Sequence, residues 1–296
     1  MLQKLQKTLR TVSTALAVSL SLVAMTPASA ADAKTIKIGW TAWSDAEAVT
    51  NIAKQLLEQR LGYKVELVMT DIALQYQGIA RGQLDVMLMS WLPTTHQGYM
   101  EKVVNDVVDL GSLYDNAKLG WAVPAYVPES ELASIADLNK PAVHKKLNGK
   151  VQGIDPGAGL MKASASAIKN YNLDNYQLQT GSDAAMIVAL DRAIKRNEWI
   201  VVTTWTPHWM FSKYKLRYLQ DPKQSLGGAE AIHALSRKGF EQDFSSAAAF
   251  IKNFKISLTD LEAIMMKAKD SSYEKEAAAY IQSHPEQVEK WLKGAK

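Results

Sequence analysis

Short stretches of alternating hydrophobic and polar residues recur along this chain, and stretches with apolar residues at helical spacing separate them. Residues 35–40 alternate as a strand does, and the apolar positions of 49–61 follow the period of a helix. Ser44 and Glu47 have the spacing of a capping box at the start of that helix. The pattern then predicts a strand, a helix and a strand at 64–69, 72–81 and 85–90. This β-α-β-α-β order is typical of a parallel sheet covered by helices.

A second series of the same kind begins near residue 150, after a loop-rich passage at 128–150 that contains two prolines. A strand is expected at 120–127, before this passage. Beyond it, the pattern predicts strands at 151–154, 176–180, 199–203 and 231–236, helices at 160–171 and 183–196, and an almost wholly helical end from residue 243. We therefore expect two α/β lobes that are joined by strands.

The first thirty residues have the pattern of a secretory signal peptide. An apolar run at 14–25 is short for a membrane span, and Ala28-Ser29-Ala30 offers a cleavage site, while the basic residues of the start are Lys4, Lys7 and Arg10. An uncleaved membrane anchor is the alternative. Because the chain has no cysteine, it lacks both disulfides and the cysteine that carries a lipid anchor. We expect a cleaved signal peptide at 1–30 and a periplasmic protein without a lipid anchor.

Composition argues against a nucleic-acid partner. The formal charge of +4 falls to +1 without the three basic residues of the signal peptide, and no tract rich in Lys and Arg occurs. The 266 residues after the signal peptide are enough for two domains with a large core.

Tryptophan, proline and histidine occur together in two places where a predicted strand ends. One is Trp91 to His96 and the other is Trp205 to Trp209, and Trp43 follows the first strand in the same way. Core packing would explain each tryptophan singly, since this side chain is usually buried. However, ligands of open parallel sheets bind beyond the carboxyl ends of strands. Three tryptophans at such places in two lobes predict one shared cleft.

The histidines do not indicate an enzyme. His96 and His208 have no neighbouring carboxylate, and no H-E-x-x-H, G-x-S-x-G or cysteine-based metal motif occurs. The glycine-rich stretch 153–159 lacks the ending of a nucleotide-binding P-loop. It suits either a small anion at a helix N-terminus or a tight turn. The sequence thus predicts no catalytic step, no cofactor and no metal site.

An aromatic cleft beside an anion site indicates a betaine. A quaternary ammonium has no N–H to donate, but indole faces attract it by up to about 2 kcal/mol each. Three faces would give roughly 6 kcal/mol, against about 8.2 kcal/mol for a micromolar complex. Charge-assisted hydrogen bonds from backbone N–H groups and a histidine to a carboxylate would supply the remainder.

These motifs give the chain a specific resemblance. It resembles the glycine betaine-binding proteins of osmoprotectant ABC importers in four motifs that occur in order: W-L-P-x-x-H at 91–96, G-I-D-P-G-A-G at 153–159, W-x-P-H-W-M-F at 205–211 and D-P-K at 221–223. The resemblance covers nearly all residues after the signal peptide. It implies contacts of the trimethylammonium group with Trp43, Trp91 and Trp205, and of the carboxylate with Gly153, Ile154 and His96.

The resemblance also implies a fold and partners. The fold is α/β, a two-lobed periplasmic binding protein of type II, in which each lobe is a βα sheet flanked by helices and the ligand lies in the interlobe cleft. Lobe 1 would contain residues 31–122 and 230–296, and lobe 2 residues 123–229. The protein would act as a monomer and deliver its ligand to an inner-membrane permease with a cytoplasmic ATPase.

Choline is the alternative ligand. Asp45 lies two residues after Trp43, and choline-binding relatives have an acidic residue near the cation. His96 and the Gly153-Ile154 turn argue for a betaine, because they have no evident role without a carboxylate. Among the other tryptophans, Trp121 is expected in the core, although it could line the cleft. His208 and Trp209 are expected to brace the segment that carries Trp205.

Overall fold

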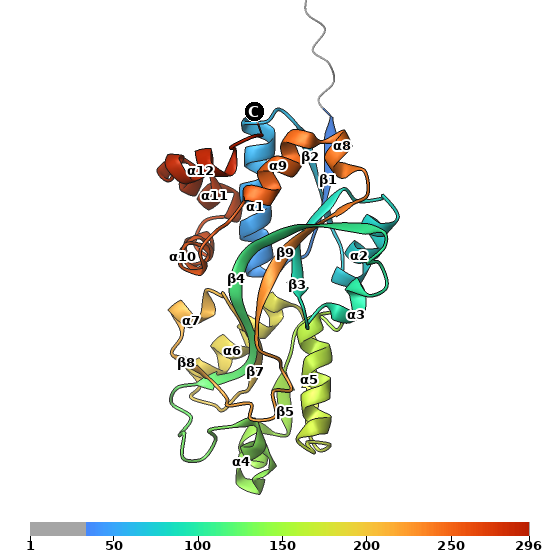
Figure 1. Ribbon diagram of the computed structural model, residues 1–296. Coiled ribbons are helices and arrows are strands. Elements are labelled where there is room, and N and C mark those ends of the chain that lie inside the picture. Colours follow the sequence, from blue (N-terminus) through green and yellow to red (C-terminus); the bar gives the residue numbers. More distant parts are fainter. Residues whose placement is uncertain (1–33, 296) are drawn as a thin grey trace, which may run out of the picture. The chain divides into compact units, whose positions relative to one another are not determined.

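The computed structural model describes residues 34–295, in which one mixed sheet of nine strands runs through the whole fold (Figure 1). Its order is β2-β1-β3-β9-β4-β7-β5-β6, and β8 pairs with β4. The strands are β1 (Thr35–Trp40), β2 (Lys64–Met69), β3 (Val86–Leu92), β4 (Val107–Pro124), β5 (Lys150–Gln152), β6 (Gln177–Gln179), β7 (Val202–Thr206), β8 (Leu216–Tyr218) and β9 (Ala229–Arg237). The proposed signal peptide at 1–30 lies outside the described residues.

Helices cover the two ends of this sheet. Beside β1, β2 and β3 lie α1 (Ser44–Gln59), α2 (Ile72–Ala80), α3 (Gln97–Met100), α8 (Phe240–Asp243), α9 (Ser245–Asn253), α10 (Leu258–Ala268), α11 (Tyr273–Ser283) and α12 (Pro285–Trp291). We call this part the first lobe. The second lobe contains β5 to β8 with the 3₁₀ helix η1 (Ile135–Asn139), α4 (Pro141–Leu147), α5 (Gly159–Asn170), α6 (Asp183–Lys195) and α7 (Met210–Lys213).

Two long strands connect the lobes. β4 and β9 pair antiparallel and cross from one lobe to the other (Figure 1). Within the first lobe β1 pairs in parallel with β2 and β3, and within the second lobe β5 pairs in parallel with β6 and β7. The lobe boundaries expected at residues 122 and 230 fall inside β4 and at the start of β9, and they remain a prediction.

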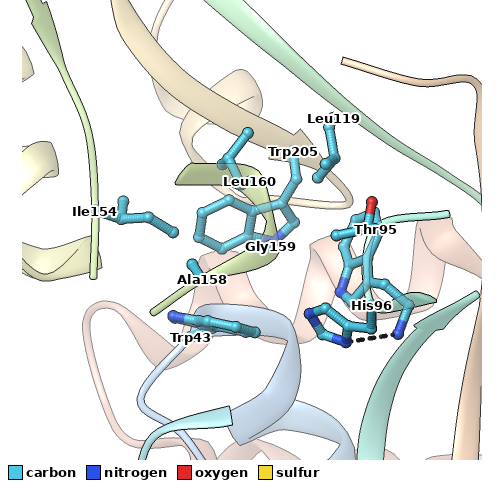
Figure 2. A pocket seen from close by; sticks show the side chains of 10 residues that line it. Trp43, Thr95, His96, Leu119, Ile154, Ala158, Gly159, Leu160 and Trp205 are labelled. Atoms are coloured by element: carbon cyan, nitrogen blue, oxygen red, sulfur yellow. Dashed lines mark hydrogen bonds between the residues drawn. The ribbon is translucent and has the colours of Figure 1, made fainter. Parts of the chain in front are cut away.

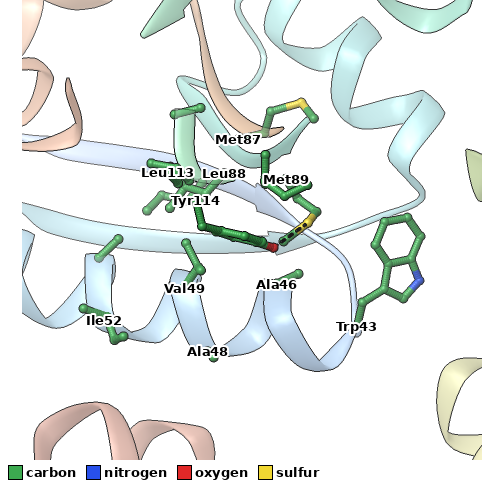
Figure 3. Packing of buried hydrophobic residues seen from close by; sticks show 14 of the residues in the cluster. Trp43, Ala46, Ala48, Val49, Ile52, Met87, Leu88, Met89, Leu113 and Tyr114 are labelled. Carbon is green, nitrogen blue, oxygen red and sulfur yellow. Dashed lines mark hydrogen bonds between the residues drawn. The ribbon is translucent and has the colours of Figure 1, made fainter. Parts of the chain in front are cut away.

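Hydrophobic side chains form one large core and one smaller core. The large core fills the first lobe and extends to second-lobe residues that face it, and the smaller core lies within the second lobe around Trp121. Figure 3 shows part of the large core, where Tyr114 of β4 lies between α1 and the methionines of β3. The Tyr114 hydroxyl is 3.7 Å from the sulfur of Met89. Among residues 34–295, no helix is long and apolar enough to cross a bilayer.

Several predicted elements differ from the observed ones. β7 begins at Val202, three residues later than expected, so Trp205 lies within the strand and pairs with Leu119 of β4. The strand expected at 120–127 is the end of β4, and the passage expected to be loop-rich contains η1 and α4. The capping box is also wrong, because Trp43 occupies the N-cap position and no side chain caps α1.

Candidate functional site

A cavity enclosed between the two lobes brings most of the expected residues together. The cavity measures about 20 Å³, and its lining consists of Trp43, Trp91, Thr95, His96, Leu119, Ile154, Ala158, Gly159, Leu160 and Trp205 (Figure 2). A volume of this size admits little more than one water molecule, so a betaine would fit only after the walls move apart. The three tryptophans and His96 are each at most 6% exposed. A ligand can therefore reach the cavity only when the lobes separate.

The indole rings form a wedge. The ring centroids of Trp43 and Trp205 are 6.4 Å apart, and the two planes meet at 56°. A cation in such a wedge can lie within about 6 Å of both centroids, which is the range of cation–π attraction. Trp91 completes the aromatic part of the lining. Since Trp43 and Trp91 come from the first lobe and Trp205 from the second, the wedge is complete only in the closed protein.

His96 is a neutral donor in this cavity. Its Nδ1 accepts a hydrogen bond from the backbone N–H of Trp91 at 3.1 Å, so the ring proton resides on Nε2. Burial, together with the positive charge of Lys162, lowers the pKa of His96 to about 3. The imidazole therefore remains uncharged near neutral pH and offers one N–H.

The N–H of Gly153, which was expected to contact the ligand carboxylate, has an acceptor within the protein. That group donates to the carbonyl oxygen of Gln179 at 2.8 Å, and Gly153 does not line the cavity. Ile154 does line it, but its N–H faces the sulfur of Met161 at 3.3 Å, a weak acceptor. The glycine-rich stretch had too many backbone donors for the sequence alone to show which are free.

The free donors lie at the start of α5. Gly159 and Leu160 are its first two residues and line the cavity, and neither N–H has a hydrogen-bond acceptor in the described structure. The first N–H groups of a helix lack intrahelical partners, and the helix dipole favours an anion there. A glycine-rich stretch before a helix is the sequence signal for such an anion site. The free N–H groups lie in the first turn of the helix and not at the beginning of the glycine-rich stretch.

Glu230 of β9 positions the turn that carries His96. Its carboxylate accepts from the backbone N–H of Thr95 at 2.9 Å and also from the Thr94 N–H and the Thr95 hydroxyl. Glu230 is 6% exposed. Three donors thus satisfy this buried carboxylate, and they fix the turn against the strand that joins the lobes.

Direct hydrogen bonds cross between the lobes around the cavity. The Trp43 indole N–H donates to Asp155 at 3.0 Å, and the Tyr99 hydroxyl donates to the Gly157 carbonyl at 2.6 Å. The ammonium group of Lys162 lies 3.6 Å from the centroid of the Tyr99 ring. These contacts show that the lobes are closed in this structure.

The remaining tryptophans have structural roles. Trp121 is fully buried in the core of the second lobe, where its indole N–H donates to the Ser164 hydroxyl at 2.9 Å. It does not line the cavity, which confirms the expectation of a core residue. His208 packs edge-on against Trp205 with centroids 4.7 Å apart, so the bracing role is confirmed as well. No group of three potential metal ligands occurs among residues 34–295.

Asp45 follows Trp43 by two residues but does not line the cavity. Its carboxylate accepts from the Tyr114 hydroxyl at 2.7 Å, while its other oxygen is buried with no partner. Burial raises the pKa of Asp45 to about 6, although the Tyr114 hydrogen bond and His208 act in the opposite direction. The protein therefore holds a carboxylate whose ionisation opposes folding.

Replacing Asp45 with asparagine is expected to stabilise the protein above pH 6. The pKa of Asp45 is higher in the folded protein than in the unfolded chain. Its contribution to the free energy of unfolding is therefore fully present below about pH 4 and is lost as pH rises through 6. The asparagine amide would keep an acceptor for Tyr114 without a charge, which should gain about 1–3 kcal/mol at pH 7.5. Melting curves from pH 4 to 8 measure this, with exposed Asp174→Asn as the control. A gain that is equal at pH 4 and 7.5 would contradict it.

A comparison with known protein families decides the class of the protein. A family model described as the substrate-binding domain of an ABC-type glycine betaine transport system matches residues 34–283. The chain belongs to this family. It is a family of transport substrate-binding domains and not one of enzymes.

One curated relative has a name that includes two betaines. The glycine betaine/carnitine transport binding protein GbuC of Listeria monocytogenes serotype 1/2a (strain 10403S) is 44% identical over 158 residues, which cover 52% of this chain and 53% of that relative. The match thus spans about half the length of this curated protein.

Solved structures of relatives match over more of the chain. The lactococcal protein OpuAC, closed and complexed with glycine betaine, is 36% identical with a TM-score of 0.81 and coverage of 88% of this chain and 99% of that one. The protein ProX of Borrelia burgdorferi is 34% identical with a TM-score of 0.82 over 87% and 96%. A choline-binding protein in complex with choline is 26% identical with a TM-score of 0.81 over 88% and 92%. The expected fold, a two-lobed periplasmic binding protein, is confirmed.

Proposed function

We propose that this protein captures glycine betaine or a related betaine in the periplasm and delivers it to an ABC importer for osmoprotectant uptake. One observation carries the proposal: a single closed cavity joins three indole walls to a set of N–H donors without acceptors of their own. The family supports the same substrate class. Binding and release would take place with no catalytic step and no cofactor.

The two ends of a betaine fit the two parts of the cavity. The trimethylammonium group would lie between Trp43, Trp91 and Trp205, where each ring contributes up to about 2 kcal/mol. The carboxylate would accept from the His96 Nε2–H and from the first N–H groups of α5, those of Gly159 and Leu160. Ile154 would contribute its side chain and, after release from Met161, its N–H. Gly153 would support the turn without contacting the ligand.

Delivery would depend on closure of the lobes. We propose residues 31–122 and 230–296 as lobe 1 and 123–229 as lobe 2, with β4 and β9 as the connection. The closed form would dock as a monomer on an inner-membrane permease that works with a cytoplasmic ATPase. A signal peptide at 1–30 would export the protein to the periplasm, where it would act without a lipid anchor.

Titration with glycine betaine tests the proposal directly. Because three tryptophans line the cavity, their fluorescence should change and saturate as the ligand binds. Glycine is the control, since it has the same carboxylate without the methyl groups. No response to glycine betaine, proline betaine or carnitine, together with a clear response to choline, would favour choline as the ligand.

Choline is the second candidate because a choline-binding protein has a similar structure. The Asp45 carboxylate is close to Trp43 in sequence, but it does not line the cavity and accepts from Tyr114 instead. The His96 N–H and the free N–H groups of α5 favour a carboxylate instead.

Replacing His96 with alanine is expected to separate the two candidates. Loss of a hydrogen bond to a charged carboxylate should weaken glycine betaine binding about tenfold. Choline binding should change by less than about threefold. The substitution also removes the acceptor of the Trp91 N–H, and this effect is the same for both ligands. Isothermal titration of both ligands measures the ratio. Equal losses for the two ligands would remove His96 from the carboxylate site.

A further inference from the structure

Ser44 has a role that its position in the sequence does not suggest. Its spacing to Glu47 predicted a capping box, but its hydroxyl does not cap α1. Instead, Ser44 Oγ donates to Asp183 Oδ2 at 3.0 Å. Ser44 begins α1 in the first lobe, and Asp183 begins α6 in the second lobe. The hydroxyl therefore makes a bond between the lobes in place of the bond expected within the helix.

Two further side chains of the second lobe complete this contact. The Trp209 indole N–H donates to Ser44 Oγ at 3.1 Å. The Nδ1 of His208 accepts from the Met210 N–H at 3.0 Å, so its proton is on Nε2, which is 3.2 Å from Asp183 Oδ1. Ser44 thus donates to one second-lobe residue and accepts from another. We call Ser44, Asp183, His208 and Trp209 the clasp.

The clasp is buried but lies outside the ligand cavity. All four side chains are at most 9% exposed, and none of them lines the cavity. The Tyr273 hydroxyl of α11, also in the first lobe, contacts Ser44 as well. When the lobes separate, water can solvate the Ser44 hydroxyl and the Trp209 N–H, whereas the closed form leaves them to their protein partners. A buried polar group without a partner costs about 1–3 kcal/mol, so the closed form depends on all the partners being present.

The negative charge of Asp183 makes the hydrogen bond donated by the Ser44 hydroxyl important for closure of the lobes. Glu47 lies one turn after Ser44 on α1, and burial together with the Asp183 charge raises the pKa of Glu47 to about 6. The charges of Glu47 and Asp183 therefore repel each other across the interface. The N-terminus of α6 and the donors Ser44 and His208 offset this repulsion at Asp183. Without the Ser44 hydroxyl, closure would bring Glu47 and Asp183 together while Asp183 had one hydrogen-bond donor fewer.

We propose that Ser44 and Asp183, with Trp209 and His208, hold the two lobes closed and so set how long a bound ligand stays in the cavity. Ser44 is a positioning residue in this role, since it follows Trp43 directly and fixes the start of α1 against the segment after Trp205. The proposal rests on the proposed function for its ligand. Apparent affinity falls with the population of the closed state, so a weaker clasp weakens binding without changing any ligand contact.

Ser44→Ala tests the clasp. Glycine betaine affinity should fall about tenfold through faster dissociation, because the lost bond involves a charged acceptor and exists only after closure. The melting temperature of the ligand-free open protein should stay the same. The chain has no cysteine, so labels on Gln59→Cys and Lys145→Cys report the interlobe distance. The distance distribution of Ser44→Ala should shift toward the open form.

Ser164→Ala is the matched control. Ser164 also accepts from a buried indole N–H, that of Trp121, but Trp121 packs in the smaller core around α5 and not at the closing interface. This variant should lower stability while leaving the dissociation rate and the interlobe distances unchanged. Trp209→Phe keeps an aromatic ring but removes the indole N–H together with part of the ring system. Because the lost donor bonds to Ser44, its effect should be non-additive with that of Ser44→Ala.

The outcomes separate the clasp from the proposed function. If the wild-type protein does not bind glycine betaine, the proposed ligand is wrong. The interlobe distances then still test the clasp, because they do not depend on the ligand. Longer distances in Ser44→Ala than in the wild type would support it. Identical distance distributions, or equal effects of Ser44→Ala and Ser164→Ala on dissociation, would overturn it.

Discussion

Replacing Gly159 with alanine is expected to weaken glycine betaine binding about a hundredfold. A Cβ at this position would lie 2.4 Å from the Thr95 methyl, 2.7 Å from the Thr95 carbonyl oxygen and 2.9 Å from the His96 ring. Gly159 belongs to the second lobe and the turn 94–96 to the first, so the clash arises only on closure. Overpacking costs about 1–3 kcal/mol, and contact with backbone places this case at the upper end. Isothermal titration measures the loss.

Gly157→Ala is the control for this variant, because a Cβ there would meet no atom within 4 Å. It changes the same loop by the same methyl group and should leave affinity within about twofold. The melting temperatures of the ligand-free variants should be alike, since neither glycine has a positive φ. If both substitutions weaken binding equally, the close approach of α5 to the 94–96 turn is not needed for binding.

Trp205→Ala should weaken betaine binding by about 2–3 kcal/mol, or roughly 30- to 150-fold. The change removes one face of the wedge and the edge contact with His208. Trp205→Phe should restore part of the loss, because a smaller aromatic face still attracts the cation. Equilibrium titration with glycine betaine provides the measurement for both variants.

Trp199→Ala controls for the loss of an indole in the same lobe. Trp199 packs on the smaller core and stacks under the ammonium of Lys146 at 4.1 Å, but it does not line the cavity. It should reduce stability and leave affinity intact. An unchanged affinity of Trp205→Ala would exclude Trp205 from the cage.

Local patterns predicted the regular elements better than the irregular ones. Clear alternation placed β1 and β2 at their observed bounds, and helical spacing placed α6 within one residue. β4 was largely missed, because register shifts between Asp109 and Ala117 interrupt its alternation. Such bulges follow from pairing with β9, a partner more than a hundred residues away. No local pattern can contain that information.

The candidate site shows the same division. The three tryptophans and His96 were identified because unusual residue types follow strands, and the structure brings them together in one cavity. The sequence could not show that Gly159 and Leu160 have free N–H groups, since this depends on pairings such as that of Gly153 with Gln179. Ser44 was misread for a related reason. A helix cap and an interlobe bond use the same hydroxyl, and only the tertiary structure decides between them.

The lining of the cavity has a consequence for molecules that the protein must reject. Its side chains include no carboxylate and no amide oxygen, and its one hydroxyl, that of Thr95, is already bound to Glu230. A primary ammonium, as in glycine or other free amino acids, would lose its water and find among the lining side chains only the Thr95 hydroxyl oxygen as an acceptor for its three N–H groups. An unmatched polar group of this kind costs several kcal/mol. Full methylation of the nitrogen removes that cost, so the shortage of side-chain acceptors disfavours common amino acids while the indole rings attract a betaine.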